Sequence, residues 1–369
     1  MTAETLRSRG ASRRSFSAGL RNPNPLVLVA ASFLLVLVLF GIDSAFASGA
    51  WSAVPLQRWI RNSNDDYMFV SWTVADLKFD PPTQPTVVLV GGSSGREALT
   101  SGPSLAASVE GAGGPQIGAW NLCTRMQRFG QSWAIVDNVP DTPTTVVIGV
   151  NADRFTTSAK SSWEQVRGIP LLIKSDSLRS LAIAQTGAYK RSYTILPGVF
   201  IAGVSYAEQR AKDLVLHGQM QSPAYTPHPF EKRATLPPAV KQQLIQKWFN
   251  DYYPAFLKML DFNAGLLDEL VSRCQARGLD VVIVELPNNR DIIGSAYDNV
   301  DAMYQPRTQE IATNHNVPYL DFNDQLDLSN EDFLDLSHLR ASGRVVWEAR
   351  LAEELAALYK SGAIEGGTQ

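Results

Sequence analysis

The sequence is poor in cysteine and histidine. Its 369 residues include two cysteines, Cys123 and Cys274, and four histidines. Two cysteines allow at most one disulfide, which excludes a fold held together by a disulfide framework. The cysteine and histidine spacing of a zinc site is absent as well, and the residues imply neither a metal nor an organic cofactor. Imidazole chemistry therefore has four candidates: His217, His228, His315 and His338.

A surplus of basic residues is also lacking. The chain has 33 Lys and Arg against 36 Asp and Glu, a formal net charge of -3. A dedicated nucleic-acid binder needs an excess of positive charge to neutralise phosphates, so this class is excluded. With 45% hydrophobic and 19% charged residues, the chain is not mainly disordered. Its length is sufficient for one large or two ordinary domains with a full core.

The charges are unevenly distributed. Residues 1–25 carry a net charge of +4, residues 156–260 carry +7, and the remainder carries -14. A basic segment over the mouth of a site would attract an anionic polymer or a lipid surface. A solvated helical cap without specific contacts explains the same composition equally well.

The longest apolar run follows the arginine-rich N-terminus. Residues 25–42 are uncharged, and a helix of this length measures about 27 Å, close to the hydrocarbon thickness of a bilayer. The sequence predicts a transmembrane anchor over 25–47 behind a cytoplasmic tail over 1–24. The positive-inside rule then places all later residues outside the cytoplasm, in the periplasm or the extracellular space. A signal peptide cleaved at Ala45-Phe46-Ala47 is the alternative, and it leads to the same compartment.

Strand and helix signals alternate beyond a Pro-containing connector over 48–85. Short β-branched apolar runs predict four buried strands, at 86–90, 144–148, 280–286 and 317–322. Helical spacing predicts helices over 266–277, ending before Gly278, and over 342–359. This alternation is typical of an α/β fold with a parallel sheet between two helical layers.

We therefore predict a three-layer α/β/α domain with a mainly parallel sheet over residues 86–360. A helical insertion at about 156–260 interrupts it, and a short tail over 361–369 follows. In such sheets the functional groups gather beyond the carboxyl ends of the strands, so the residues after each strand are the candidates for a site.

Side chains with catalytic chemistry occupy these positions. Ser93 lies in a glycine-rich turn after the first strand, Asn151 follows the second, and Asp335 and His338 precede the last helix. A serine hydroxyl becomes a nucleophile when a base takes its proton, and an acid must orient that base. We predict Ser93 as nucleophile, His338 as base and Asp335 as its partner. Asn151 and backbone N–H groups of the Ser93 turn would stabilise an oxyanion.

This ordered set resembles the SGNH/GDSL hydrolase superfamily. Gly91-Gly92-Ser93 is similar to the family's nucleophile block, Gly149-Val150-Asn151 to its Gly-x-Asn block, and Asp335-Leu336-Ser337-His338 to its terminal Asp-x-x-His. The resemblance covers about residues 86–155 and 261–360. It implies the three-layer fold and a serine, histidine and aspartate triad at these positions.

Two features depart from the family pattern, and a third leaves open which serine aligns with the family's nucleophile. Gly92 replaces the family's aspartate before the nucleophile. The segment 120–124 carries Asn121 of the second block but no glycine close behind it. The tandem serines also make Ser94 an alternative nucleophile.

The resemblance extends to membrane-anchored relatives that acylate envelope polymers. It implies transfer of an acyl group to a surface polysaccharide, or its removal, beside a multispanning membrane acyltransferase. The partners expected are an acylated glycan or envelope polymer and the membrane, with no nucleic acid. A non-catalytic, membrane-tethered glycan-binding or assembly protein of the same fold is the competing hypothesis. A lipid-directed esterase would be expected to have a more apolar insertion.

Overall fold

A computed structural model provides the structure of the protein. It describes residues 25–47, 55–60, 62–141, 143–158, 161–162, 175–186, 207–208, 210–216, 218, 224–231 and 233–365. The chain divides into two units, residues 1–51 and residues 52–369, and each is described by itself. The predicted tail over 1–24, His217 and much of the basic insertion lie outside the described residues.

The first unit contains the segment predicted as an anchor. It forms helix α2 (Pro25–Ala47), 23 residues long, with exposed apolar side chains that include Leu26 and Phe33. Among the described residues, no helix combines the length and the apolar character that crossing a bilayer requires. The predicted membrane span therefore gains no support from the structure.

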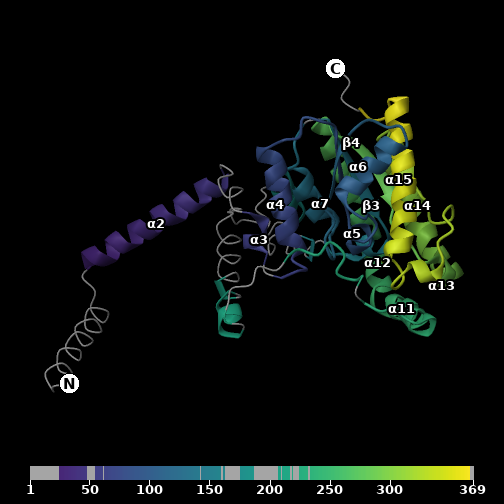
Figure 1. The fold of residues 1–369 in the computed structure, drawn as a ribbon, viewed down its shortest axis with the longest axis horizontal. Coiled ribbons are helices and arrows are strands. Elements are labelled where there is room, and N and C mark those ends of the chain that lie inside the picture. The colour runs from purple at the N-terminus through teal and green to yellow at the C-terminus, as the bar shows by residue number, and fades with distance from the viewer. Residues whose placement is uncertain are drawn as a thin grey trace. The chain divides into compact units, whose positions relative to one another are not determined.

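The second unit is built on a five-stranded sheet (Figure 1). Its strands are β1 (Thr86–Val90), β2 (Gly118–Asn121), β3 (Thr144–Val150), β4 (Asp280–Glu285) and β5 (Tyr319–Leu320). Their order across the sheet is β2-β1-β3-β4-β5, and each of these neighbouring pairs is parallel. The predicted α/β class with a parallel sheet is confirmed.

Helices cover both faces of the sheet, because alternate strand residues point to opposite sides. Val88 and Val90 of β1 lie in one core, and Val87 and Leu89 lie in the other. The first core is covered by α4 (Asp66–Phe79), α7 (Phe129–Val136), α12 (Tyr253–Ala276) and α14 (Asp298–Asn314). The second is covered by α6 (Gly102–Gly111) and α15 (Ala341–Ser361), which lie side by side (Figure 1).

Further helices complete the described part of the chain. The α-helices are α3 (Leu56–Trp59), α5 (Ser93–Arg96), α9 (Asp176–Thr186), α11 (Pro238–Asp251) and α13 (Arg290–Ile293). The 3-10 helices are η2 (Ala152–Thr156), η3 (Gly294–Tyr297) and η4 (Asn330–Asp332). Of these, α5 and η4 flank the site described below.

Several elements differ from the sequence prediction. Strand β2 was not predicted, because it is short and carries a glycine and an asparagine, which are depleted in strands. Strand β5 spans two residues rather than six. Helix α12 begins at Tyr253 rather than near residue 266. The segment predicted as a connector contains α4, whose Val70 and Val74 are fully buried in the first core.

Strand β4 ends in a buried carboxyl group. Glu285 is fully buried, and the hydroxyls of Tyr304 and Tyr319 each donate a hydrogen bond of 2.8 Å to its carboxyl oxygens. Burial and the charge of Asp321 raise the pKa of Glu285 to about 8, although the two tyrosine hydrogen bonds oppose the shift. The folded protein therefore favours the protonated form of this side chain near neutral pH.

The free energy of unfolding should gain a negative pH slope from Glu285. Between the pKa of an unfolded glutamate, about 4.3, and the folded value of about 8, the folded state binds more protons than the unfolded state. Its contribution to stability is thus greatest at low pH and is lost as the pH rises through the folded pKa. Urea unfolding of wild type and Glu285→Gln at several pH values measures this difference. Equal slopes in the two proteins would contradict the assignment.

Candidate active site

The turn after β1 places Ser93 at the carboxyl end of the sheet. Gly92 is extended, and α5 begins at Ser93. The turn passes close to β2: a Cβ on Gly95 would lie 2.8 Å from Cys123 Sγ, and one on Gly91 would lie 3.3 Å from it. Small residues are therefore needed on both sides of the two serines.

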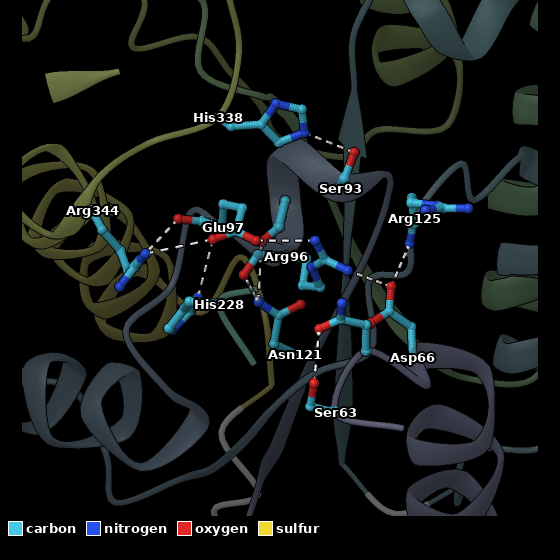
Figure 2. Close-up of polar contacts among 12 residues, drawn as sticks. Ser63, Asp66, Ser93, Arg96, Glu97, Asn121, Arg125, His228, His338 and Arg344 are labelled. Carbon is cyan, nitrogen blue, oxygen red and sulfur yellow. Dashed lines mark hydrogen bonds and ion pairs between the residues drawn. The ribbon is translucent and has the colours of Figure 1, made fainter. Parts of the chain in front are cut away.

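Three of the predicted site residues form a continuous hydrogen-bonded chain. His338 Nε2 lies 2.8 Å from Ser93 Oγ, and His338 Nδ1 lies 2.9 and 2.8 Å from the two carboxyl oxygens of Asp335. Figure 2 shows the imidazole turned toward the serine hydroxyl. The serine comes from one strand end and the other two from the loop before α15, so the fold joins residues 245 positions apart.

Asp335 is held in its ionised form. Burial raises the pKa of this carboxyl group, but the hydrogen bond and charge of His338 lower it, as do the backbone N–H groups of Ser337 and His338. The net effect is a pKa below the usual value. Both backbone N–H groups donate to Asp335 Oδ1 at 3.0 Å. An ionised acceptor fixes the proton on His338 Nδ1 and leaves Nε2 to accept from serine.

The two serines of the turn have different environments. Ser94 is buried, and its hydroxyl accepts a hydrogen bond of 3.2 Å from Asn151 Nδ2. Ser93 is partly exposed and contacts the histidine. Asn151 thus lies beside the turn, with its amide directed at the residue next to Ser93. Of the two candidate nucleophiles, the geometry favours Ser93.

Two buried side chains hold the loop that carries Asp335 and His338. Lys241 of α11 donates to the backbone oxygens of Asn330 and Phe333 at 3.1 and 3.0 Å. Asn289 follows β4 and donates from Nδ2 to the backbone oxygen of Asp335 at 3.1 Å. Both side chains are fully buried. The insertion and the central sheet therefore both fix the position of this loop.

A buried ion network lies beneath the serine turn (Figure 2). Arg96 pairs with Asp66 at 2.5 Å and with Glu97 at 3.0 Å. The fully buried Glu97 also lies 3.6 Å from Arg344 Nη2 and 3.5 Å from His228 Nδ1. Each member is at least nine-tenths buried. The network ties α5 to α4, to α15 and to the insertion.

The insertion also contacts the imidazole. The Phe230 ring meets His338 edge-on with centroids 4.7 Å apart. The guanidinium groups of Arg96 and Arg233 lie 5.1 and 4.3 Å from the centre of the same ring. Phe230 is therefore a positioning residue: it limits the space into which the imidazole can rotate.

Sequence reasoning missed these supporting residues. Asn289 comes shortly after a predicted strand, so the rule that selected Asn151 applies to it as well. Arg96 and Glu97 follow the glycine-rich turn, and no sequence motif marks them as supporting residues. His228 is one of the four histidines of the sequence, and its sequence neighbours include Pro227 and Pro229. It is buried, because it packs against Glu97 and contacts the backbone oxygen of Thr100 at 2.9 Å.

Asn121, the asparagine of the irregular second block, has a local structural role. Its Nδ2 donates to the backbone oxygens of Gly95 and Arg96 at 3.0 and 3.2 Å, and its Oδ1 accepts from Cys123 N at 3.1 Å. These bonds fasten α5 to β2. Its amide is thus engaged by the turn itself.

The cysteines do not supply a competing nucleophile. Cys123 and Cys274 are both free and buried, and burial is the main cause that raises the pKa of each thiol, for Cys274 to about 12. A thiol in such surroundings is not ionised near neutral pH. Within the described part of the chain, no group of His, Cys, Asp and Glu side chains is arranged to hold a metal ion.

Comparison with known proteins finds distant structural similarity but no match in sequence. The sequence matches no protein-family model and no curated protein. A solved structure similar to this chain is that of a Bacteroides fragilis protein provisionally named an acylhydrolase. The likeness covers 77% of this chain and 94% of that one, with a TM-score of 0.38 and 13% sequence identity. A likeness of this degree assigns no activity, so the chemistry must be inferred from the geometry of the site.

Proposed function

We propose that this protein is a serine-dependent acyl-ester hydrolase or acyltransferase. The observation that carries the proposal is the continuous chain of hydrogen bonds from Ser93 through His338 to Asp335. A nucleophile, a base within hydrogen-bonding distance and an acid that orients the base are the groups that acyl transfer needs. In this arrangement Ser93 attacks, and the other two residues act on its proton.

The proposed reaction has two halves. Ser93 Oγ attacks the acyl carbon while His338 Nε2 takes the hydroxyl proton, and Asp335 stabilises the imidazolium. The ester C–O bond then breaks, the alcohol leaves with the proton from His338, and the acyl group remains on Ser93. Water or an acceptor hydroxyl next attacks the acyl carbon while His338 takes its proton; the bond from the acyl carbon to Ser93 Oγ then breaks, and His338 returns the proton to Ser93.

Asn151 is the proposed side-chain donor to the oxyanion. Its Nδ2 already points at the serine turn, where it binds Ser94 Oγ. The first N–H groups of a helix lack intrahelical partners, so the start of α5 adds donors beside Ser93. Asn121 takes no part in this scheme, because its Nδ2 already donates to two backbone oxygens, whereas that of Asn151 donates to one hydroxyl.

The substrate and the location are proposed from the sequence. The resemblance to SGNH hydrolases that modify envelope polymers favours an acylated surface polysaccharide, with a multispanning acyltransferase as partner. The arginines before residue 25 and the apolar run after them favour action outside the cytoplasm. Fractionation of cells that express the full chain, followed by protease treatment of intact spheroplasts, tests the location.

Labelling by a fluorophosphonate probe tests the proposed chemistry. The probe reacts with an activated serine, so wild type should be labelled and Ser93→Ala should not. Ser94→Ala is the matched control and should keep its label, since the hydroxyl that bonds His338 is that of Ser93, whereas the Ser94 hydroxyl bonds Asn151. Circular dichroism shows that each variant is folded. If the folded wild type took up no label, the non-catalytic glycan-binding hypothesis would replace this one.

A further inference from the structure

A large groove runs along β2, the terminal strand of the sheet. Its volume is about 630 Å³, within the range of sites for small organic ligands. It is bordered by α6, by β2 and by the insertion residues Tyr225 and His228, and Ser93 is not among its lining residues. Arg96, three residues beyond Ser93 on α5, lines one part of it. The groove is thus separate from the candidate catalytic residues but adjoins the same turn.

An aromatic platform forms part of the groove. The half-buried Trp120 shares a strand face with Gly118, because residues two apart point to the same side. A Cβ on Gly118 would lie 2.5 Å from Trp120 Cη2 and 3.1 Å from Gln84 Nε2. The absence of a side chain at this position therefore lets the indole fold over the strand with the amide of Gln84 beside it. An aromatic pair, Phe69 stacked on Tyr225 with ring centroids 4.1 Å apart, also lines the groove.

Polar groups accompany these rings. The lining includes the exposed amides of Gln84 and Gln116 and the hydroxyl of Ser101. Arg96 and His228 are more than nine-tenths buried, and Arg96 Nε and His228 Nδ1 have no hydrogen-bond partner among the described residues. His228 Nδ1 lies 3.5 Å from Glu97 Oε2. Because protein atoms cover both nitrogens, the polar groups that a ligand in the groove can reach are the amides of Gln84 and Gln116 and the hydroxyl of Ser101.

We propose that the groove along β2 binds the sugar chain of an uncharged glycan, whose acyl ester is then presented to Ser93. This inference rests on the proposed function. Sugar rings combine apolar C–H faces, which pack on aromatic rings, with hydroxyl groups that bond to amides and guanidinium groups. The lining offers both kinds of contact in one place.

The polar groups argue against an alkyl chain in this groove. An alkyl chain would cover the amides of Gln84 and Gln116 and the hydroxyl of Ser101 without offering them hydrogen-bond partners, and burying such groups without a partner is unfavourable. The positive charge of Arg96 is balanced by Asp66 and Glu97, so it provides little attraction for a highly anionic polymer. The ligand should therefore carry hydrogen-bonding groups and no large negative charge, and an uncharged, hydroxyl-rich ligand has both properties.

Kinetics on two substrates separate this groove from the chemistry. Trp120→Ala should leave turnover of p-nitrophenyl acetate nearly unchanged, because that ester needs only the catalytic residues. On acetylated xylo-oligosaccharides it should lower kcat/KM about tenfold, mainly through KM, the loss typical of a truncated aromatic anchor. Gly118→Ala, which retains the indole but displaces it, should act in the same direction. Tyr252→Ala removes an aromatic side chain that is 43% exposed outside the groove and should behave as wild type.

Binding is measured in Ser93→Ala to keep the two proposals distinguishable. Titration with deacylated xylo-, manno-, gluco- and galacto-oligosaccharides, followed by tryptophan fluorescence, should show saturable binding that Trp120→Ala abolishes. If esterase activity survives in Ser93→Ala, the proposed function fails while the binding result still decides the groove. Saturation by dodecanoate with no response to any sugar of the panel would overturn the glycan proposal. So would equal kcat/KM of wild type and Trp120→Ala on every acetylated oligosaccharide.

Discussion

Replacing Ser93 with alanine should lower kcat on an activated acetyl ester by roughly three to six orders of magnitude. The expected loss is large because the variant retains the loop, the groove and the helix start but has no atom to form the acyl-enzyme. Residual turnover would come from binding and from the oxyanion donors alone. Release of p-nitrophenol under saturating substrate measures the effect directly.

The same measurement on His338→Ala and on the double variant Ser93→Ala/His338→Ala tests whether Ser93 and His338 act in one step. Residues of a catalytic chain are strongly non-additive, so both single variants and the double variant should fall to about the same rate. His315→Ala is the matched control, since His315 forms a surface pair with Asp268 at 2.7 Å. Independent, multiplying losses would argue that Ser93 and His338 do not share a step.

Replacing Glu97 with alanine should reduce the free energy of unfolding by about 3–5 kcal/mol, the usual cost of removing one partner from a buried charge cluster. Glu97 is fully buried between Arg96 and Arg344, so its loss leaves two guanidinium groups with too few acceptors. Chemical denaturation followed by tryptophan fluorescence provides the measurement.

An exposed glutamate provides the matched control. Glu353 pairs with Arg350 in successive turns of α15, and Glu353→Ala should cost less than about 1 kcal/mol because solvent screens such pairs. If Glu97→Ala does not fold, Glu97→Gln retains the shape and one of the two acceptor oxygens and should give a smaller, measurable loss. A midpoint in Glu97→Gln equal to that of wild type would show that the charge network contributes nothing to stability.

The central strands were predictable because their signals are local. Runs such as Val87 to Val90 are apolar and β-branched over a few residues, and burial on both faces of a parallel sheet requires this pattern. Ser93 and Asn151 were then chosen as candidates because functional groups gather beyond the carboxyl ends of parallel strands. Strand β2 was not predicted, because two of its residues serve contacts other than strand pairing. Gly118 leaves room for the indole of Trp120, and Asn121 donates a hydrogen bond to the turn after β1.

The residues that support the site were not predictable for a different reason. Asp66, Arg96 and Arg344 come from α4, α5 and α15, and no local pattern marks charges that will meet in a folded core. His228 shows the same limit: its polar neighbours in sequence suggest exposure, whereas Glu97 and Thr100 surround it in space. Asp335 and His338 were recognisable because their partnership spans three residues.

The acid and the base of the hydrogen-bonded chain lie in one short loop, which also forms hydrogen bonds within itself. Phe333 and Leu339 close it by an isolated bridge, and Leu334 N donates to His338 O at 2.8 Å. The contact between His338 and Asp335 therefore depends on a few neighbouring residues, whereas the contact with Ser93 depends on the whole sheet. A shift of β1 relative to the loop before α15 would therefore lengthen the distance between Ser93 and His338. The hydrogen bond between His338 and Asp335 would remain. On the proposed function, the esterase rate would thus respond to small changes in the packing of the domain, before the loop itself unfolds.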